Sequence, residues 1–377
     1  MIIGVPKEVK NNENRVGITP ALAASLIKRG NTVYIERGAG AESGFSDNEY
    51  IQSGAFILNS AKEVYDISDM IIKVKEPIEQ EYELLKSEQI LFTYLHLAAN
   101  KSLTQVLLDK KITGIAYETV QTDDGRLPLL IPMSEVAGRM SAQIGARLLE
   151  KPNGGKGILM GGTPGTLPAK VLIVGAGTVG FNAALMVSGL GADVTIMDID
   201  LKKLEKIDSL YSGRIKTLAS DYTNLSTMIS SSDLVISTVL VPGAKAPKII
   251  TEDMVKSMSE GSVIVDVAVD QGGSVETADK ATTHENPTYK KYGVVHYSVA
   301  NIPGAVARTS TLALTNATKY YAELLANNGI ISAINTNSAL LRGVNTMYGK
   351  LTYKPVADAL DLNFTPLSDL IDLQTAI

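Results

Sequence analysis

Short apolar runs alternate with amphipathic stretches along the first part of the chain. The β-branched runs that predict strands are residues 1–5, 32–36, 70–75 and 90–96, and the stretches with helical spacing are 20–29 and 103–110. Thr19 and Pro20 have the order of an N-cap and a first-turn proline, and Gly30 is placed to end that helix. Strands that alternate with helices predict a parallel sheet with helices on its faces.

A second series of apolar runs begins at Lys170. Its expected strands are residues 171–174, 193–198, 214–219, 234–239, 263–269 and 294–299. Six such strands suit a doubly wound, dinucleotide-binding domain. Between the two series, an apolar stripe at Val136, Met140, Ile144 and Leu148 predicts a long connecting helix that Ser134 caps, and a glycine-rich loop follows at 153–165.

The last part of the chain is helical in pattern, over residues 311–327, but has few candidate strands. We therefore expect it to pack back onto the first domain. The pattern as a whole predicts an α/β protein of two doubly wound parallel-sheet domains with a cleft between them. Residues 1–133 and 303–377 form the first domain, and residues 134–302 form the second, a Rossmann domain.

The amino-acid composition limits the reactions that this chain can catalyse. The 377 residues include no Cys and only three His. Disulfides, thiolate nucleophiles and cysteine-ligated metals are thereby excluded, so we expect redox chemistry through an organic cofactor and no metal centre. Proton transfer near neutral pH falls to His96, His284 or His296, or to a Lys or carboxylate with a shifted pKa. We expect His296, within a strand, to be structural, and His284 to lie in a surface loop.

Charge and hydropathy exclude two classes of partner. The formal net charge is −5 and the basic residues are dispersed, so we expect no nucleic-acid partner. No apolar run approaches the roughly 20 residues of a membrane span, and a proline and charges appear too early for a signal peptide. A soluble, cytoplasmic protein is expected.

A glycine motif directly follows the first strand of the second series. Gly175, Gly177 and Gly180 fit G-x-G-x-x-G, which permits a tight turn, close approach of a pyrophosphate and close helix packing. The helix that follows offers free N–H groups to phosphates. The next strand ends in Asp198, 18 residues beyond Gly180, where a carboxylate accepts from a ribose hydroxyl and repels a 2′-phosphate. NAD is therefore favoured over NADP. Lys202 and Lys203 follow Asp198 and could admit some NADP, but a solvated helix face is the interpretation we favour for them.

Ionisable residues follow several of the predicted strands, where ligands of parallel sheets bind. Arg15 follows the first strand, Lys73 and Lys75 share one face of another, His96 ends a third, and Asp270 ends a strand of the second domain. Each also has a structural interpretation: a surface charge for Arg15, a snorkelling side chain for Lys73, a core histidine for His96 and a helix cap for Asp270. Their convergence at strand ends favours a common site.

This set of residues suits hydride transfer coupled to proton transfer. Arg15 can bind a carboxylate with two hydrogen bonds, and Lys75 can stabilise negative charge on a substrate oxygen. His96 can exchange the proton that accompanies hydride transfer. Asp270 can position an amine, a water molecule or the nicotinamide ribose. An α-amino or α-hydroxy acid fits this arrangement.

Several longer motifs carry a family resemblance. They are KEVKNNENRVGITP at 7–20, IIKVKEP at 71–77, LFTYLHLA at 91–98, IPMSEVAGRMS at 131–141, VIVDVAVDQGG at 263–273 and ALTNATKYY at 313–321. Together they resemble the NAD-dependent L-alanine dehydrogenases over almost the whole chain. The resemblance implies reversible conversion of L-alanine, NAD⁺ and water to pyruvate, ammonia and NADH, and it implies a homohexamer.

The same resemblance implies roles for individual residues. Arg15 and Lys75 bind the substrate, and His96 and Asp270 are catalytic. The implied cofactor contacts are Ser134, Gly175, Gly177, Thr178, Val179, Gly180, Asp198, Lys203, Ser220, Val239, Leu240, Val267, Ala268, Val269, Asp270, Val299, Ala300, Asn301 and Ile302. Alternatives are an NAD-linked oxidoreductase of another small amino or imino acid, a relative of the NAD-binding part of transhydrogenase, and a non-catalytic NADH sensor.

Overall fold

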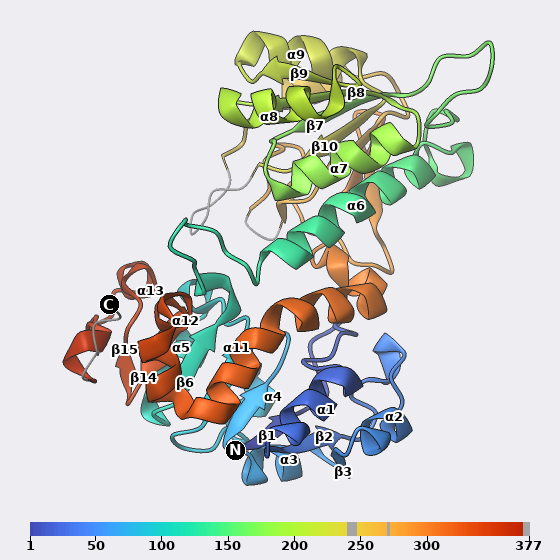
Figure 1. Cartoon of the computed structure of the whole chain (residues 1–377). Coiled ribbons are helices and arrows are strands. Elements are labelled where there is room, and N and C mark those ends of the chain that lie inside the picture. The colour runs from blue at the N-terminus through green and yellow to red at the C-terminus, as the bar shows by residue number, and fades with distance from the viewer. Residues whose placement is uncertain (240–246, 270–271, 372–377) are drawn as a thin grey trace. The chain divides into compact units, whose positions relative to one another are not determined.

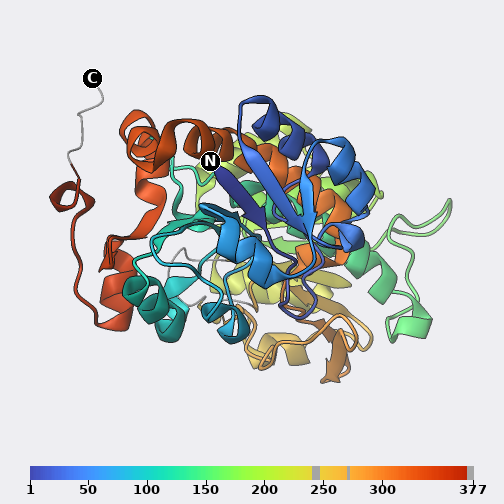
Figure 2. The same cartoon turned by 90° about the horizontal axis from the view of Figure 1, so that it is seen from below.

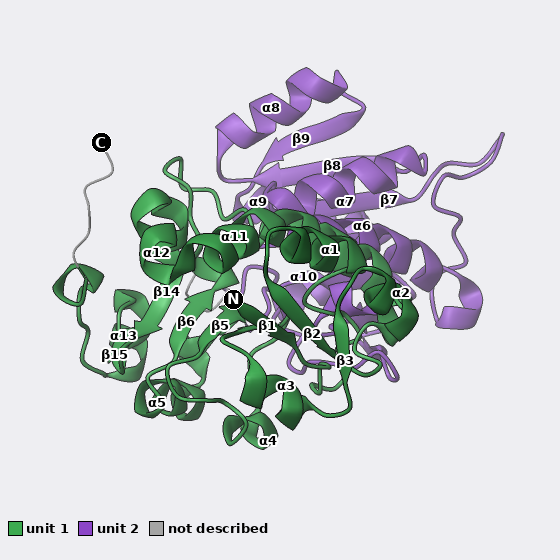
Figure 3. Cartoon of the chain, turned by 60° about the horizontal axis from the view of Figure 1, so that its bottom comes forward, with its two compact units in different colours: residues 1–133, 306–377 green, residues 134–305 purple. Residues whose placement is uncertain are grey.

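The computed structural model describes residues 1–239, 247–269 and 272–371. The chain divides into two compact units, residues 1–133 with 306–377 and residues 134–305 (Figure 3). The sequence places the second boundary three residues earlier, at 302/303. Within the described ranges, no helix combines the length and the apolar character needed to cross a membrane.

The first unit is built on an eight-stranded sheet with the order β15-β14-β6-β5-β4-β1-β2-β3 (Figure 1). The strands are β1 (Ile2–Val5), β2 (Thr32–Glu36), β3 (Phe56–Leu58), β4 (Met70–Ile72), β5 (Ile90–Thr93), β6 (Thr113–Ala116), β14 (Val344–Met347) and β15 (Lys350–Leu351). Strands β1 to β6 pair in parallel, as predicted. The hairpin β14–β15 adds an antiparallel edge that the sequence pattern did not predict.

The helices of this unit are α1 (Pro20–Lys28), α2 (Asp47–Gln52), α3 (Ala61–Ile67), α4 (Glu79–Tyr82), α5 (Lys101–Asp109), α11 (Ala307–Thr336), α12 (Ser338–Gly343) and α13 (Lys354–Leu360). The N-cap prediction for α1 is confirmed, because Thr19 Oγ1 accepts a hydrogen bond from the backbone N–H of Leu22 at 3.3 Å. Helix α11 returns the C-terminal part of the chain to α1, where Ser25 donates to Glu323 at 2.6 Å (Figures 1 and 2).

The second unit contains a seven-stranded sheet with the order β12-β13-β11-β10-β7-β8-β9. Its strands are β7 (Lys170–Val174), β8 (Asp193–Asp198), β9 (Ile215–Ala219), β10 (Leu234–Ser237), β11 (Val263–Asp266), β12 (Thr288–Lys291) and β13 (Val294–Tyr297), and its helices include α7 (Thr178–Gly189), α8 (Leu201–Tyr211), α9 (Tyr222–Ser231) and α10 (Glu252–Lys256). Without β12, this is the Rossmann order, and the six predicted strands are confirmed. Strand β12 is an antiparallel edge.

The core of the second unit lies on both faces of its sheet. Alternate residues of β7 point to opposite sides, so that Val171 and Ile173 join the cluster around α7, and Leu172 and Val174 join the cluster around α9. This double burial explains why the strands are continuous apolar runs.

The connecting helix α6 (Ile131–Leu148) begins earlier than predicted. Pro132 lies in its first turn, where a residue without an N–H is tolerated. Ser134 is therefore inside the helix, and the expectation that it caps the helix is wrong.

Candidate active site

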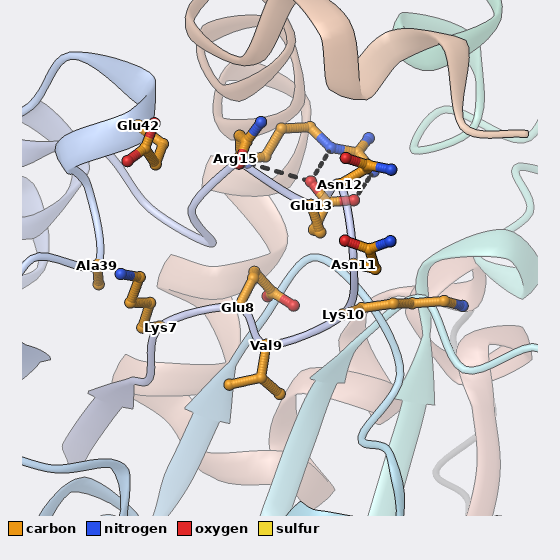
Figure 4. A pocket seen from close by; sticks show the side chains of 11 residues that line it. Lys7, Glu8, Val9, Lys10, Asn11, Asn12, Glu13, Arg15, Ala39 and Glu42 are labelled. Carbon is orange, nitrogen blue, oxygen red and sulfur yellow. Dashed lines mark hydrogen bonds and ion pairs between the residues drawn. The ribbon is translucent and has the colours of Figure 1, made fainter. Parts of the chain in front are cut away.

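Arg15 lies in the loop between β1 and α1, and its side chain is buried with Glu13 (Figure 4). Its Nε donates to Glu13 Oε1 at 2.6 Å, and its Nη2 donates to Oε2. Burial alone would raise the pKa of Glu13, but the hydrogen bonds from Arg15 and the positive charges of Arg15 and Lys75 together outweigh burial and lower it. The interpretation of Arg15 as a surface charge is thereby excluded, and Glu13 holds one edge of its guanidinium in a fixed plane.

A pocket of about 290 Å³ lies beside this pair. It is lined by residues 7–15 together with Ala39 and Glu42, whose side chains surround it in Figure 4. The pocket shares Arg15 with the predicted site, but Lys75 and His96 are not among its lining residues.

Lys73 and Lys75 have different surroundings, although the sequence placed them on one face. Strand β4 ends at Ile72, so the alternation of a strand does not extend to them. The side chain of Lys73 is completely buried between Glu8 and Glu81, with N–O distances of 3.3 and 2.8 Å. Burial alone would lower the pKa of Lys73, but the two carboxylates outweigh burial and raise it. Lys73 is therefore a structural ion-pair residue and does not snorkel.

Lys75 lies in the opposite electrostatic environment. Burial lowers the pKa of its ammonium, and the positive charge of Arg15 lowers it further. Within the described part of the chain, no hydrogen bond or ion pair is found for the Lys75 ammonium. Arg15 and Lys75 thus place two cations close together, which favours an anionic ligand.

His96 follows β5 by three residues and has a left-handed backbone conformation, with φ of 49°. The carboxylate of Glu118, in the 3₁₀ turn Tyr117–Thr119, accepts the backbone N–H of His96 at 2.6 Å and that of Leu95 at 3.1 Å. The His96 side chain is 45% exposed, which excludes a core histidine. Its ring stacks on Tyr94, with centroids 5.9 Å apart.

Glu76 contacts the His96 ring. Its Oε2 lies 3.0 Å from His96 Nδ1, and its Oε1 bonds to the Lys10 ammonium. Burial alone would raise the pKa of Glu76, but the hydrogen bond with His96, and after it the contact with Lys10, lower it to about 2. Glu76 is therefore a charged carboxylate at neutral pH.

The glycine loop of the second unit has the backbone that its motif predicts. Gly175 has φ of 104°, a region that side chains rarely adopt. A Cβ on Gly180 would lie 1.8 Å from the carbonyl oxygen of Gly175, whereas a Cβ on Gly177 would have no atom within 4 Å. Gly180 therefore allows close packing, and Gly177 leaves open space at the start of α7, where N–H groups can bind a phosphate.

Asp198 ends β8 beside this loop. Its carboxylate accepts the backbone N–H groups of Ala176 at 2.7 Å and Asp200 at 2.8 Å. Burial alone would raise its pKa, but these two N–H groups and Lys203, 3.3 Å away, lower it. Asp198 is therefore ionised and fixed in place at the end of β8, the position at which the sequence predicts a ribose contact.

The other predicted cofactor residues lie after the C-terminal ends of the parallel strands. Ser220 follows β9, Val239 follows β10, Val267, Ala268 and Val269 follow β11, and Val299, Ala300, Asn301 and Ile302 follow β13. Two helices carry three more of the predicted cofactor residues: Ser134 lies in the first turns of α6, and Thr178 and Val179 begin α7. Leu240 and Asp270 lie outside the described residues.

The other two histidines differ from His96. His296 is buried, and its Nε2 lies 2.7 Å from Thr277 Oγ1 while burial lowers its pKa. This environment is the structural one that was predicted. His284 is partly buried, and its Nε2 lies 3.3 Å from the carbonyl oxygen of Asn301, a contact that the sequence did not reveal.

Sequence reasoning missed the carboxylates that hold these residues. Glu13 and Glu76 lie within the family motifs given above, but the sequence alone does not show that Glu13 binds Arg15 or that Glu76 binds His96. Glu118 is separated from His96 by 22 residues. Only the parallel pairing of β5 with β6 brings the turn that carries Glu118 next to His96.

Comparisons with known proteins extend over nearly the whole chain. Residues 4–137 match the N-terminal domain, and residues 141–354 the C-terminal domain, of the family described as alanine dehydrogenase/PNT. An alanine dehydrogenase of Methanococcus maripaludis is 60% identical over 97% of this chain and 98% of its own length. One of Staphylococcus saprophyticus is 55% identical over 98% of this chain and 100% of its own length.

Solved structures give the same result for the fold. An L-alanine dehydrogenase superposes with a TM-score of 0.93 and 48% identity, over 96% of this chain and 99% of that one. A transhydrogenase from Sinorhizobium meliloti superposes with a TM-score of 0.79 and 25% identity, over 94% of this chain and 99% of that one.

Proposed function

This chain belongs to the alanine dehydrogenase family, and on that basis we propose that it catalyses the reversible oxidative deamination of L-alanine with NAD. In the balanced reaction, L-alanine, NAD⁺ and water give pyruvate, ammonium, NADH and a proton. The observation that carries this proposal is the 60% identity to an alanine dehydrogenase over nearly the full length of both chains.

The second unit has residues that fit NAD. The open space at Gly177, the N–H groups at the start of α7 and the ionised Asp198 match a pyrophosphate and a ribose diol. When bound, NAD supplies the acceptor for the hydride that leaves Cα of alanine. The proposed contacts are those of the predicted cofactor set.

In the first unit, we assign substrate binding to Arg15 and Lys75. The guanidinium of Arg15, held in its plane by Glu13, binds the carboxylate of alanine or pyruvate. The Lys75 ammonium binds a substrate oxygen and stabilises the negative charge that develops on it. A bound carboxylate also offsets the repulsion between these two cations. The site thus gains favourable electrostatic energy when substrate enters.

We assign proton transfer to His96. During deamination, its ring takes a proton from the water that adds to the imino carbon of the substrate. It then returns that proton to the nitrogen, the C–N bond breaks to release ammonia, and the added hydroxyl group gives up its own proton to become the carbonyl oxygen of pyruvate. The predicted catalytic role of Asp270 belongs to this proposal as well.

The proposal is tested by following NADH absorbance with pyruvate and ammonium. We expect oxidation that requires both, is fastest with pyruvate among 2-oxo acids, and is much slower with NADPH. A preference for another 2-oxo or imino acid would reassign the substrate. NADH binding without turnover at saturating ammonium would instead support a sensor and contradict the proposal.

Two further features belong to the proposal. We propose a cytoplasmic enzyme that assembles as a homohexamer, with neither a membrane nor a nucleic acid as a partner. The homohexamer is proposed because the chain resembles the L-alanine dehydrogenases. Light scattering is expected to give about six times the chain mass of 40.1 kDa.

A further inference from the structure

Glu76 holds one nitrogen of the histidine to which we assign proton transfer. Its carboxylate is only 11% exposed and lies 3.0 Å from His96 Nδ1. We propose that Glu76 is a positioning residue that keeps the proton of neutral His96 on Nδ1, so that Nε2 is the nitrogen that exchanges protons with substrate. This inference deepens the proposed function and rests on it.

The tautomer follows from the hydrogen-bonding capacity of the two groups. An ionised carboxylate only accepts hydrogen bonds, so a hydrogen bond at this distance requires Nδ1 to donate. In the neutral ring, Nε2 then has the lone pair and can act as a base. When the ring is protonated, the negative charge of Glu76 stabilises it, as in other carboxylate–histidine pairs.

The charged groups around the ring come from several segments. Glu76 follows β4, Lys10 belongs to the loop after β1, and Glu118 belongs to the turn after β6. Glu118 accepts backbone N–H groups, which fixes the left-handed conformation of His96. Glu118 therefore places the residue, and Glu76 orients its ring.

Lys10 makes a specific test possible. In a Glu76→Gln variant, the side chain keeps its shape but has one acceptor end and one donor end. The Lys10 ammonium only donates, so the amide oxygen turns toward Lys10 and the amide NH₂ turns toward His96 Nδ1. Nδ1 must then accept, and the proton moves to Nε2. We expect the tautomer to invert.

Nitrogen NMR of the histidine rings reads the tautomer without any turnover. With three histidines in the chain, a His96→Gln variant identifies the His96 signals. We expect a protonated Nδ1 in the neutral ring of the wild type and of Glu76→Asp, and a protonated Nε2 in Glu76→Gln. A protonated Nε2 in the wild type, or no change in Glu76→Gln, would overturn the proposal.

Kinetics give a second readout. For Glu76→Gln we expect kcat to fall by about 100-fold or more, with a much smaller change in KM for pyruvate, because the loss is one of general-base catalysis. Adding Lys10→Met frees the amide to turn its oxygen back to Nδ1. The double variant should therefore recover about 10-fold in kcat over Glu76→Gln, a non-additive result.

Controls separate this role from a structural one. Glu79→Gln makes the same chemical change at an exposed position three residues away and should leave kcat and the NMR tautomer unchanged. A double variant no faster than Glu76→Gln would contradict the proposal. If the wild type shows no ammonium-dependent turnover, the proposed function fails, whereas the NMR result still decides the tautomer.

Discussion

The predicted sites of the two units are formed by different chemical groups: mainly backbone groups in the second unit, and charged side chains in the first. In the second unit, the cofactor site consists of a glycine turn, the start of α7 and one carboxylate fixed by backbone N–H groups. In the first unit, the site consists of ionised side chains that hold one another, such as Arg15 with Glu13. Backbone sites require particular residues at fixed spacing, whereas charged sites require partners from distant segments. The two should therefore respond differently to substitution.

The largest effect is expected at Lys73. Lys73→Met leaves Glu8 and Glu81 buried without their cation, and we expect the free energy of unfolding to fall by about 3–5 kcal/mol. Chemical denaturation followed by circular dichroism measures this loss. A change below about 1 kcal/mol would show that the ion pairs of Lys73 with Glu8 and Glu81 contribute little to the free energy of unfolding.

The backbone site is tested by a matched pair of glycine substitutions. Gly180→Ala places a Cβ against the Gly175 carbonyl oxygen, so we expect a loss of about 1–3 kcal/mol in stability and a loss of NADH binding. Gly177→Ala has open space for its Cβ. It should keep the stability of the wild type but weaken NADH binding roughly 10-fold, because the methyl group occupies space near the phosphate site. Equal stability losses in the two variants would contradict this interpretation.

The pKa of Lys75 is lowered in the folded protein, whereas that of Lys73 is raised. Since the pKa of Lys75 is lowered from 10.5, the folded protein binds this proton less tightly than the unfolded chain, and stability rises with pH between the two values. Lys75→Met should therefore be more stable than the wild type at neutral pH, and its advantage should shrink as the pH rises through that window. Its turnover should fall about 100-fold or more. Unfolding midpoints measured across this pH range, together with kcat, test both statements; a less stable variant at neutral pH would refute the first.

The smallest effect is expected at Asp198. Asp198→Ser removes the charge that repels a 2′-phosphate and leaves Lys203, now without its partner, close to that position. We expect the ratio of kcat/KM for NADPH to that for NADH to rise roughly 10-fold. Steady-state kinetics with both cofactors measure the ratio, and an unchanged ratio would argue against a role of Asp198 in selection.

Much of the fold could be predicted from the sequence, and so could the backbone of the glycine motif, because both depend on residue types at fixed positions. The strands of the second unit are buried on both faces, so they appear as continuous apolar runs. A Cβ on Gly180 would clash with the carbonyl oxygen of Gly175, so a glycine is expected at that position. Strands β15 and β12 escaped prediction because short edge strands bury little apolar surface. Strand β14 is buried, but Asn345 and Thr346 stand at its centre, so no apolar run marks it.

The charged site of the first unit could be predicted from the sequence only in part. Arg15, Lys75 and His96 could be selected because they follow strands, but the role of Lys73 could not, since its partners Glu8 and Glu81 come from other segments. A pattern that alternates along a strand also fails once the strand ends, as it does at Ile72.

The most direct test of the whole account is the rate of NADH oxidation by a His96→Gln variant with saturating pyruvate and ammonium, after its NADH affinity has been shown to equal that of the wild type. Because the first unit is assigned the proton transfer and the second the cofactor, we predict a fall in kcat of about 10²–10⁴-fold with unchanged NADH binding. Turnover close to that of the wild type would contradict the account.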